Sequence, residues 1–260
     1  MTRKTIMMTL MTATVLLLAT QAACKRDAVP DEETTMETRQ HHKHADAEVN
    51  EGDKHAHHGK HGEHGHHHEH RFEDPEKYAE RWNNPERDAW QKPEEIVAAM
   101  QIEPGASVAD LGTGTGYMVP WLAKAVGEEG RVLALDVEAS MVTYVEGRVE
   151  KEGLSTVEVI QVDPKDPGLE PGSLQAMMTL NTWHHIAGRP EYAKKIAAGL
   201  EPGGRFVIVD FLKDESIDGP PMEMRLTAEE VVAELSGAGF SSVEIVEETL
   251  DRHYIVRATK

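Results

Sequence analysis

The chain has 260 residues, and its 27 lysines and arginines against 46 aspartates and glutamates give a net charge of −19 at pH 7. Such an acidic surface repels nucleic-acid phosphates and anionic lipid headgroups, so the charge excludes DNA, RNA and electrostatic membrane binding. The one cysteine leaves no second thiol for a disulfide within the chain.

The chain begins with a segment that predicts export. Residues 5–23 are apolar, Arg3 and Lys4 precede them, and small residues follow. This order is typical of a signal peptide. A retained membrane anchor is the alternative, since the segment is almost long enough to span a bilayer. Both interpretations leave the rest of the chain outside the cytoplasm, because the positive end stays inside.

Cys24 directly follows the sequence QAA. It resembles the lipobox cysteine of bacterial lipoproteins, which is acylated and becomes the mature N-terminus. Ordinary cleavage after Ala22 or Ala23 is the alternative. The resemblance implies a signal over residues 1–24 and a periplasmic protein whose only membrane contact is its N-terminal lipid.

Residues 25–70 contain almost no large apolar side chains. Because they cannot bury enough surface to offset their ordering, we predict a disordered linker. Within it, residues 41–70 carry 12 of the 15 histidines, and imidazole binds zinc, nickel and copper. The tract is therefore a candidate metal buffer, but a solvated spacer is an equal alternative, because no fixed spacing defines a closed site. The candidate ligands are His41, His42, His44, His55, His57, His58, His61, His64, His66, His67, His68 and His70.

From Arg71 onward the composition is that of one globular domain, residues 71–260. Short runs rich in Val, Leu and Ile predict buried strands, and stretches with helical spacing separate them. The strands are expected at 107–111, 131–137, 157–162, 174–180 and 205–211, and the helices at 117–127, 139–152 and 189–200. This alternation predicts a parallel, doubly wound α/β sheet.

The end of the chain departs from this alternation. After a helix at 227–238, strands at 242–250 and 253–259 are separated by only Asp251 and Arg252. Such a short connection requires an antiparallel hairpin. The sequence therefore predicts a mostly parallel seven-stranded sheet with a C-terminal antiparallel hairpin.

A glycine-rich turn follows the first strand, with Gly112, Gly114 and Gly116 in G-x-G-x-G spacing. Glycines there let a ligand approach the backbone closely. Dinucleotide-binding turns have G-x-G-x-x-G, whereas Tyr117 occupies the third glycine position here. Asp110, two residues before the turn, is unfavourable beside a pyrophosphate but suits a ligand with an ammonium group. These residues favour S-adenosyl-L-methionine (SAM) over NAD.

Five motifs between residue 72 and the end of the chain resemble those of class I SAM-dependent methyltransferases in order and spacing. They are VADLGTGTGY (108–117), VLALDVEASMV (132–142), QVDPKD (161–166), LEPGGRFVIVDF (200–211) and RLTAEEVVAELSGAGF (225–240). The resemblance implies the Rossmann-like class I methyltransferase fold, methyltransferase activity and SAM as the cofactor.

The resemblance also implies which residues bind the cofactor. Asp136 stands where the family's acidic residue binds both ribose hydroxyls, and a carboxylate can accept two such hydrogen bonds. Asp163 stands where the family holds the adenine amino group. Either aspartate alone could cap a helix, but their recurrence at the carboxyl ends of successive strands favours a ligand site. The implied cofactor residues are Asp110, Gly112, Thr113, Gly114, Gly116, Tyr117, Asp136, Val137, Asp163 and Asn181.

The fourth strand ends in NTWHHI (181–186), where the resemblance implies that the methyl group and the acceptor lie. His184 or His185 is the candidate general base, because imidazole titrates near neutral pH. The alternatives are that one histidine only packs beneath the cofactor, and that alignment alone drives the transfer. Gln175 stands where a commoner form of the family has an acidic residue, so that contact is not expected.

Residues 71–104 precede the first strand and predict short helices that lie over the cofactor as a lid. PERDAWQKPEE (85–95) resembles a subgroup of exported bacterial methyltransferase-like proteins. Arg87, Asp88 and Gln91 are expected to face the site, with a surface helix packed on the sheet as the alternative. Residues 213–225 are expected to form the opposite wall. The aromatic residues behind the helix prediction are Phe72, Tyr78, Trp82 and Trp90.

Three interpretations of function remain open: an exported methyltransferase with a small-molecule acceptor, a non-catalytic SAM-fold protein, and a metal-handling lipoprotein. SAM is made in the cytoplasm, so export favours the second and third. The glycine turn with Asp110, Asp136 and Asp163 favours the first. No cysteine cluster or basic patch marks another acceptor class. The sequence makes no prediction of oligomeric state.

Overall fold

The structure is a computed structural model that describes residues 74–246 and 250–260. The predicted export segment, Cys24, the histidine-rich linker and Phe72 therefore lie outside the described residues. Within the described residues, none of the helices combines the length and the apolar character that crossing a membrane requires.

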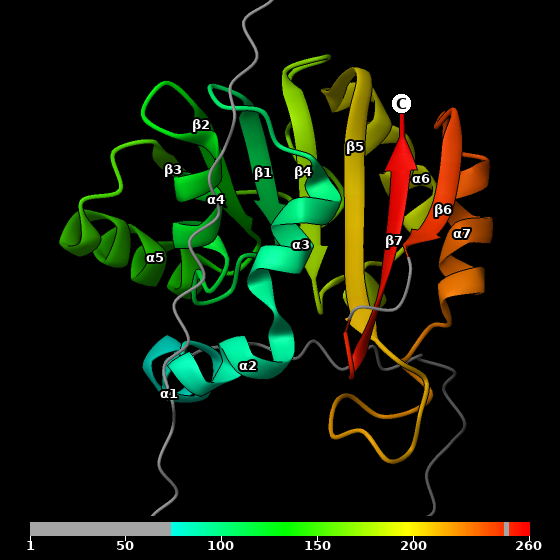
Figure 1. The fold of residues 1–260 in the computed structure, drawn as a ribbon, viewed down its shortest axis with the longest axis horizontal. Coiled ribbons are helices and arrows are strands. Elements are labelled where there is room, and N and C mark those ends of the chain that lie inside the picture. The colour runs from blue at the N-terminus through cyan, green and yellow to red at the C-terminus, as the bar shows by residue number, and fades with distance from the viewer. Residues whose placement is uncertain (1–73, 247–249) are drawn as a thin grey trace, which may run out of the picture. The chain divides into compact units, whose positions relative to one another are not determined.

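A seven-stranded sheet forms the centre of the described fold, in the order β3-β2-β1-β4-β5-β7-β6 (Figure 1). Neighbouring strands from β3 to β5 are parallel, and β7 is antiparallel to both β5 and β6. The predicted fold class is therefore confirmed. The strands are β1 (Ser107–Leu111), β2 (Arg131–Asp136), β3 (Val157–Gln161), β4 (Leu174–Leu180), β5 (Leu200–Phe211), β6 (Ser242–Val246) and β7 (His253–Thr259).

Helices cover both faces of this sheet. α3 and α4 pack on one face, and α6 and α7 pack on the other. α1 and α2 lie at the edge where the parallel strands end, at the bottom of Figure 1. The helices are α1 (Pro75–Trp82), α2 (Asp88–Gln91), α3 (Pro93–Met100), α4 (Val119–Val126), α5 (Ala139–Glu152), α6 (Arg189–Gly199) and α7 (Ala228–Ser236), with short 3₁₀ helices η1 (Pro85–Arg87) and η2 (Trp183–His185).

Strand β5 shows why the central strands are continuous apolar runs in the sequence. Phe206 and Ile208 pack with α6 and α7, whereas Val207 and Val209 pack with α3 and α4. All four side chains are fully buried. A strand that is covered on both faces has no solvent side, so it shows no polar alternation.

Several predicted boundaries were wrong. β5 begins at Leu200 rather than at 205, because Leu174 pairs with Leu200 before the register shifts. β6 ends at Val246 rather than at 250, since Leu250 is buried in the core on the α3 face instead of continuing the strand. The connection to β7 is therefore longer than the two residues expected. α4 begins at Val119, slightly later than predicted.

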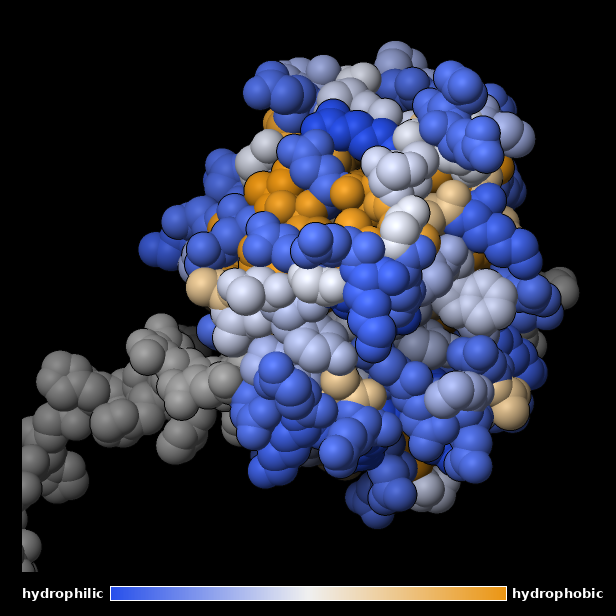
Figure 2. All heavy atoms as spheres, turned by 90° about the vertical axis from the view of Figure 1, so that its left-hand side faces the viewer, coloured by the Kyte–Doolittle hydropathy of each residue, from blue (hydrophilic) through white to orange (hydrophobic). Residues whose placement is uncertain are grey.

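The connection between β3 and β4, residues 162–173, contains no helix. On the α6 face of this edge, Ile160, Val162 and Leu169 are only partly buried. Figure 2 looks at this side of the molecule and shows apolar side chains in a recess between polar ones. Apolar surface therefore reaches solvent at the β3 edge.

The loop after β5 is organised by one buried arginine. Arg225 is 5% exposed and lies 5.6 Å from the centre of the Phe211 ring. Carbonyls in an irregular loop lack strand partners, and a guanidinium offers five N–H donors to them. The carbonyls that accept from Arg225 are those of Leu212, Asp214, Ile217 and Pro220.

We expect Arg225→Met to lower the free energy of unfolding by about 3 kcal/mol, because four carbonyls in a partly buried loop lose a charged donor. Urea denaturation followed by circular dichroism measures the change. Arg205 on β5 is partly exposed, so Arg205→Met is the matched control and should change stability by less than about 0.5 kcal/mol. Equal losses in the two variants would contradict the role given to Arg225.

Candidate functional site

The glycine turn joins β1 to α4 and packs against Thr182, the residue after Asn181. Gly112, Gly114 and Gly116 have φ of +70°, +55° and +76°, a backbone region that favours glycine. A Cβ on Gly112 would lie 2.3 Å from Cγ2 of Thr182, so a larger residue does not fit. Close packing of the Gly112 backbone against the Thr182 side chain therefore requires glycine at that position.

Asp110 lies near the end of β1 and is 2% exposed. Its carboxylate accepts a hydrogen bond from the Thr113 hydroxyl at 2.9 Å. Burial raises the pKa of Asp110 to about 7, while the Thr113 hydrogen bond opposes the rise and the charge of Asp136 adds to it. A buried carboxylate is costly without a cationic partner. The surroundings of Asp110 therefore favour a ligand that brings positive charge.

Asp136 is the last residue of β2 and is 7% exposed. One carboxylate oxygen accepts from the Gly114 N–H at 2.8 Å, and the other accepts from the Glu138 N–H at 3.0 Å. Burial raises the pKa of Asp136, and these backbone hydrogen bonds oppose the rise. Each oxygen keeps a second lone pair, so the carboxylate can still accept from a vicinal diol.

Asn181 and Asp163 follow β4 and β3. Asn181 has a φ of +56°, and its side-chain oxygen is buried with no hydrogen-bond partner in the described part of the chain. Asp163 is exposed and accepts from the Lys165 N–H at 2.7 Å, which stabilises a turn. Binding of the adenine amino group by Asp163 stays a prediction.

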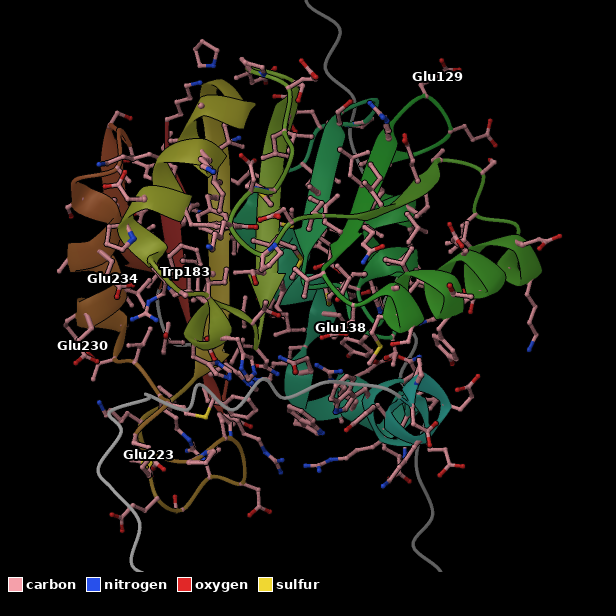
Figure 3. All side chains as sticks on the ribbon, turned by 180° about the vertical axis from the view of Figure 1, so that it is seen from behind. Glu129, Glu138, Trp183, Glu223, Glu230 and Glu234 are labelled. Atoms are coloured by element: carbon pink, nitrogen blue, oxygen red, sulfur yellow. The ribbon has the colours of Figure 1, made fainter. Side chains whose placement is uncertain are left out.

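The two candidate bases differ in their surroundings. The His184 side chain is 3% exposed, and its Nδ1 lies 2.8 Å from a carboxylate oxygen of Asp210 near the end of β5. His185 is exposed, and its ring centre lies 4.2 Å from that of His184. Trp183 is fully buried and donates to Glu234 of α7 at 3.0 Å; the two side chains lie together in Figure 3. The buried His184 therefore has the orienting carboxylate that a general base uses.

The helices before β1 are anchored to the glycine turn. The Asn83 amide donates to the Thr115 carbonyl at 3.1 Å, and its oxygen accepts from the Thr115 hydroxyl at 2.8 Å. The Tyr117 hydroxyl donates to Asp88 at 2.7 Å. The segment that was expected as a lid therefore lies against the turn, with Asp88 pointing toward it.

Arg87 and Gln91 also point inward from this segment. The guanidinium of Arg87 stacks 3.9 Å from the centre of the Tyr117 ring and donates to the Gln91 side-chain oxygen at 3.0 Å. Burial lowers the pKa of Arg87 to about 10. Gln91 is fully buried, and its Nε2 has no partner among the described residues. A surface helix would not bury these groups.

Three residues that sequence reasoning missed belong to the same region. Asp210 follows the rule that selected Asp136, a carboxylate at the carboxyl end of a strand, and could have been found. Arg148 of α5 donates to two carbonyls of the glycine turn at 3.1 and 2.8 Å. His253 is 1% exposed, neither ring nitrogen has a described partner, and burial lowers its pKa to about 4. No pattern in the sequence indicates a role at this site for Arg148 or His253.

Among the residues that the structure describes, no group of three or more His, Cys, Asp or Glu side chains is placed to hold a metal ion. The histidine tract lies outside these residues. Binding of zinc, nickel or copper there stays a prediction.

Known proteins share this fold and these motifs. The family model of the methyltransferase domain matches residues 108–204. The crystal structure of a SAM-dependent methyltransferase from Aquifex aeolicus is 30% identical, covers 72% of this chain and 98% of that one, and has a TM-score of 0.66. This chain belongs to the class I SAM-dependent methyltransferases. SAM is the cofactor of that family.

Other relatives of this methyltransferase-family chain match a smaller part of their own length. A protein of transposon Tn4556 from Streptomyces fradiae is 35% identical over 130 residues, 50% of this chain and 37% of that protein. A demethylmenaquinone methyltransferase of Bacillus cereus is 25% identical over 122 residues, 47% of this chain and 51% of that enzyme. The chain thus spans about half the length, or less, of these two relatives.

The polar groups at the carboxyl edge of the sheet fit SAM. The buried Asp110 carboxyl and the unpartnered Asn181 oxygen match an ammonium group, which needs acceptors. The remaining lone pairs of Asp136 match the two ribose hydroxyls. Val137, which is 42% exposed beside Asp136, offers an apolar surface to the adenine ring.

The pKa of Asp110 predicts a pH dependence of stability. The folded pKa of about 7 lies above the ordinary value of 3.8, so the folded state holds this proton more tightly than the unfolded state. Relative to Asp110→Asn, the unmodified protein should lose stability as pH rises from about 4 to about 7, by at most about 1.4 kcal/mol per pH unit, and no further above that range. Urea unfolding of both proteins across this range tests the prediction, and a constant difference would contradict it.

Proposed function

We propose that this chain transfers a methyl group from SAM to a small-molecule acceptor outside the cytoplasm. The observation that carries the proposal is the buried Asp110 carboxyl beside the glycine turn, which has a hydroxyl donor in Thr113 and is suited to an ammonium group. Asp136 and Asn181 bring further acceptors to the same edge of the sheet. A structural role alone does not require three such groups at the ends of three strands.

Each group has a separate part in this function. Asp110 and Asn181 hold the ammonium end of SAM, and Asp136 holds the ribose. When bound, SAM supplies a methyl group on a sulfonium, which is already a good leaving group. The segment of α1 and α2 excludes water from the site, because Asn83 and Asp88 hold it against the glycine turn.

His184 is the proposed general base. Asp210 binds Nδ1, which fixes the ring and leaves Nε2 to accept a proton from the acceptor. His185 is exposed, whereas the His184 side chain is 3% exposed and held in one orientation. We therefore assign the base to His184 and keep His185 as a comparison residue.

A small molecule is the acceptor class that the chain supports. Its net charge of −19 disfavours nucleic acid. The Bacillus cereus relative is named for demethylmenaquinone, and an acceptor of comparable chemistry is compatible with this chain. Metal handling by the histidine tract is the second candidate function, and the 12 histidines that crowd residues 41–70 support it.

Methyl transfer is tested by incubating the full chain with methyl-labelled SAM and a small-molecule extract of the bacterial periplasm. Asp136→Asn should weaken SAM binding by about 10- to 100-fold, the loss of hydrogen bonds to a charged group. Asp166→Asn, at an exposed aspartate, should leave binding unchanged. His184→Asn should lower the rate about 100- to 10,000-fold with SAM affinity unchanged, and His185→Asn should not.

Two results would contradict this function. If the chain binds SAM at micromolar affinity and labels nothing, the non-catalytic alternative holds. If His185→Asn lowers the rate as much as His184→Asn, the carboxylate contact does not select the base.

Export and anchoring are proposed to depend on residues 1–24. Cys24→Ser should abolish incorporation of labelled fatty acid and release the protein from the membrane into the periplasm, because the lipid is the proposed anchor. Cell fractionation and labelling measure both effects. Labelling that persists in Cys24→Ser would show that Cys24 is not the acylated residue.

A further inference from the structure

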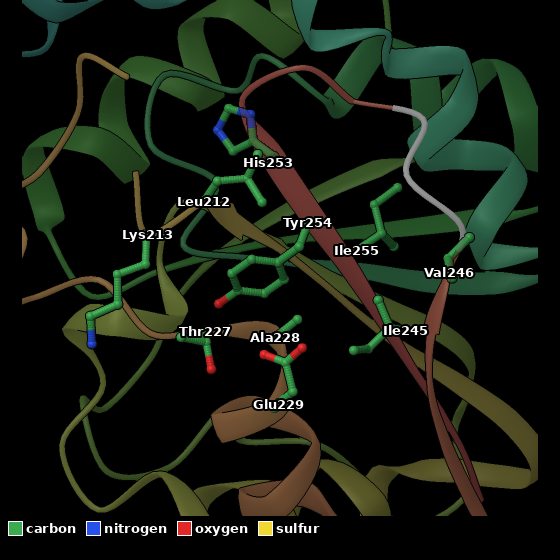
Figure 4. A pocket seen from close by; sticks show the side chains of 10 residues that line it. All are labelled: Leu212, Lys213, Thr227, Ala228, Glu229, Ile245, Val246, His253, Tyr254 and Ile255. Atoms are coloured by element: carbon green, nitrogen blue, oxygen red, sulfur yellow. The ribbon is translucent and has the colours of Figure 1, made fainter. Parts of the chain in front are cut away.

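A pocket of about 330 Å³ opens beside the C-terminal strands, apart from the glycine turn (Figure 4). Its volume is in the range of small-molecule sites. Strands β6 and β7, the start of α7 and the two residues after β5 form its walls. We call it the hairpin pocket; its lining residues are Leu212, Lys213, Thr227, Ala228, Glu229, Ile245, Val246, His253, Tyr254 and Ile255.

Tyr254 supplies one of the polar side chains that line the hairpin pocket. The residue is 5% exposed, and its hydroxyl has no hydrogen-bond partner in the described part of the chain. In Figure 4 the ring lies across the pocket and the hydroxyl points toward the side of Lys213 and Thr227. Buried hydroxyls in native proteins are nearly always paired. An unpaired one that lines a pocket marks a place for a ligand atom.

The charges around this hydroxyl limit the kind of ligand. Burial raises the pKa of Tyr254 well above its ordinary value, and the carboxylates of Asp210 and Glu234 add to the rise. The phenol is therefore neutral and can donate its proton in a hydrogen bond. The ammonium of Lys213 lies 3.7 Å from Glu230 and is partly neutralised by it. The excess of carboxylates disfavours an anionic ligand.

Part of the remaining wall is apolar. Leu212, Ile245 and Ile255 contribute branched aliphatic side chains to the pocket, and Val246 follows Ile245 along the edge strand. Ile245 is 43% exposed, one of the two most exposed large apolar side chains in the described residues. The hairpin pocket thus combines an aliphatic wall with the neutral phenol of Tyr254, and its other polar lining side chains are Lys213, Thr227, Glu229 and His253.

We propose that the hairpin pocket binds a small uncharged molecule with an apolar body and one hydroxyl or carbonyl oxygen, which accepts a hydrogen bond from Tyr254. Phenols, ketones and aldehydes are the matching chemical classes. The site lies on the β5–β7–β6 side of the sheet, whereas Asp110 and Asp136 lie at the ends of β1 and β2. The proposal therefore stands whether or not the chain transfers methyl groups.

Three matched aromatic probes test the proposal on the full-length protein by ligand-detected NMR titration with SAM in excess. p-Cresol offers the oxygen, toluene lacks it, and 4-methylbenzoate adds a negative charge. We expect p-cresol to bind about 2- to 10-fold more tightly than toluene, the effect of one neutral hydrogen bond. 4-Methylbenzoate should bind more weakly than p-cresol.

Tyr254→Phe tests whether the preference for p-cresol over toluene comes from the Tyr254 hydroxyl. In that variant p-cresol and toluene should bind equally. Tyr192→Phe is the matched control, because Tyr192 is 4% exposed, packs in the same core cluster and does not line the pocket. It should keep the preference for p-cresol.

A second readout separates lost recognition from lost folding. Removing an unpaired buried hydroxyl relieves its desolvation cost, so the Tm of Tyr254→Phe should rise by a few degrees. The proposal is overturned if neither neutral probe binds, if SAM displaces p-cresol, or if Tyr254→Phe keeps the preference for p-cresol.

Discussion

The hydrogen bond from the Gly114 N–H to the Asp136 carboxylate, 2.8 Å long, joins the turn after β1 to the end of β2. The same carboxylate accepts from Glu138, just before α5 begins. One side chain therefore fixes the glycine turn and the entry to a helix at once. Because the proposed ribose contacts use lone pairs that these bonds leave free, the structural and ligand roles of Asp136 coexist.

Contacts between the N-terminal helices and the glycine turn are largely polar, and the Trp82 ring also lies against Gly114. Asn83, Asp88 and Arg87 bind Thr115 and Tyr117 through hydrogen bonds and ring stacking. Each such contact contributes on the order of 1 kcal/mol, which is enough together to hold the segment closed. The composition of this contact thus suits a lid.

Regular elements were predictable where local pattern alone decides them. The predicted bounds are correct for β1, β4, α5 and β7. A strand buried on both faces appears as an unbroken run of apolar residues, and a helix appears as apolar residues at helical spacing, so both can be recognised from neighbouring residues. The end of β6 was missed because it depends on where Leu250 is buried. The site divides in the same way. The carboxylates at the ends of strands can be found once the strands are predicted. The contact between His184 and Asp210 cannot, because the two residues follow or end different strands and meet only in the folded chain.

Four described side chains have a buried polar atom with no hydrogen-bond partner, and they lie at one edge of the sheet. They are Gln91 at the end of α2, Asn181 after β4, and His253 and Tyr254 at the start of β7. The parallel strands end at this edge and the antiparallel β7 begins there, which places Asn181, His253 and Tyr254. Trp90, next to Gln91, stacks on His253 with ring centroids 5.9 Å apart.

Each unpaired group costs on the order of 1–3 kcal/mol relative to a satisfied one, and an apolar residue of similar shape would avoid that cost. A fold under selection for stability alone would not concentrate such groups at the place where open α/β sheets bind ligands. His253 likewise lowers the stability of the fold. Because its pKa is lowered to about 4 in the folded chain, the fold loses stability as pH falls from about 6.5 toward about 4. A ligand that pairs with these groups would restore the stability that they cost the free chain.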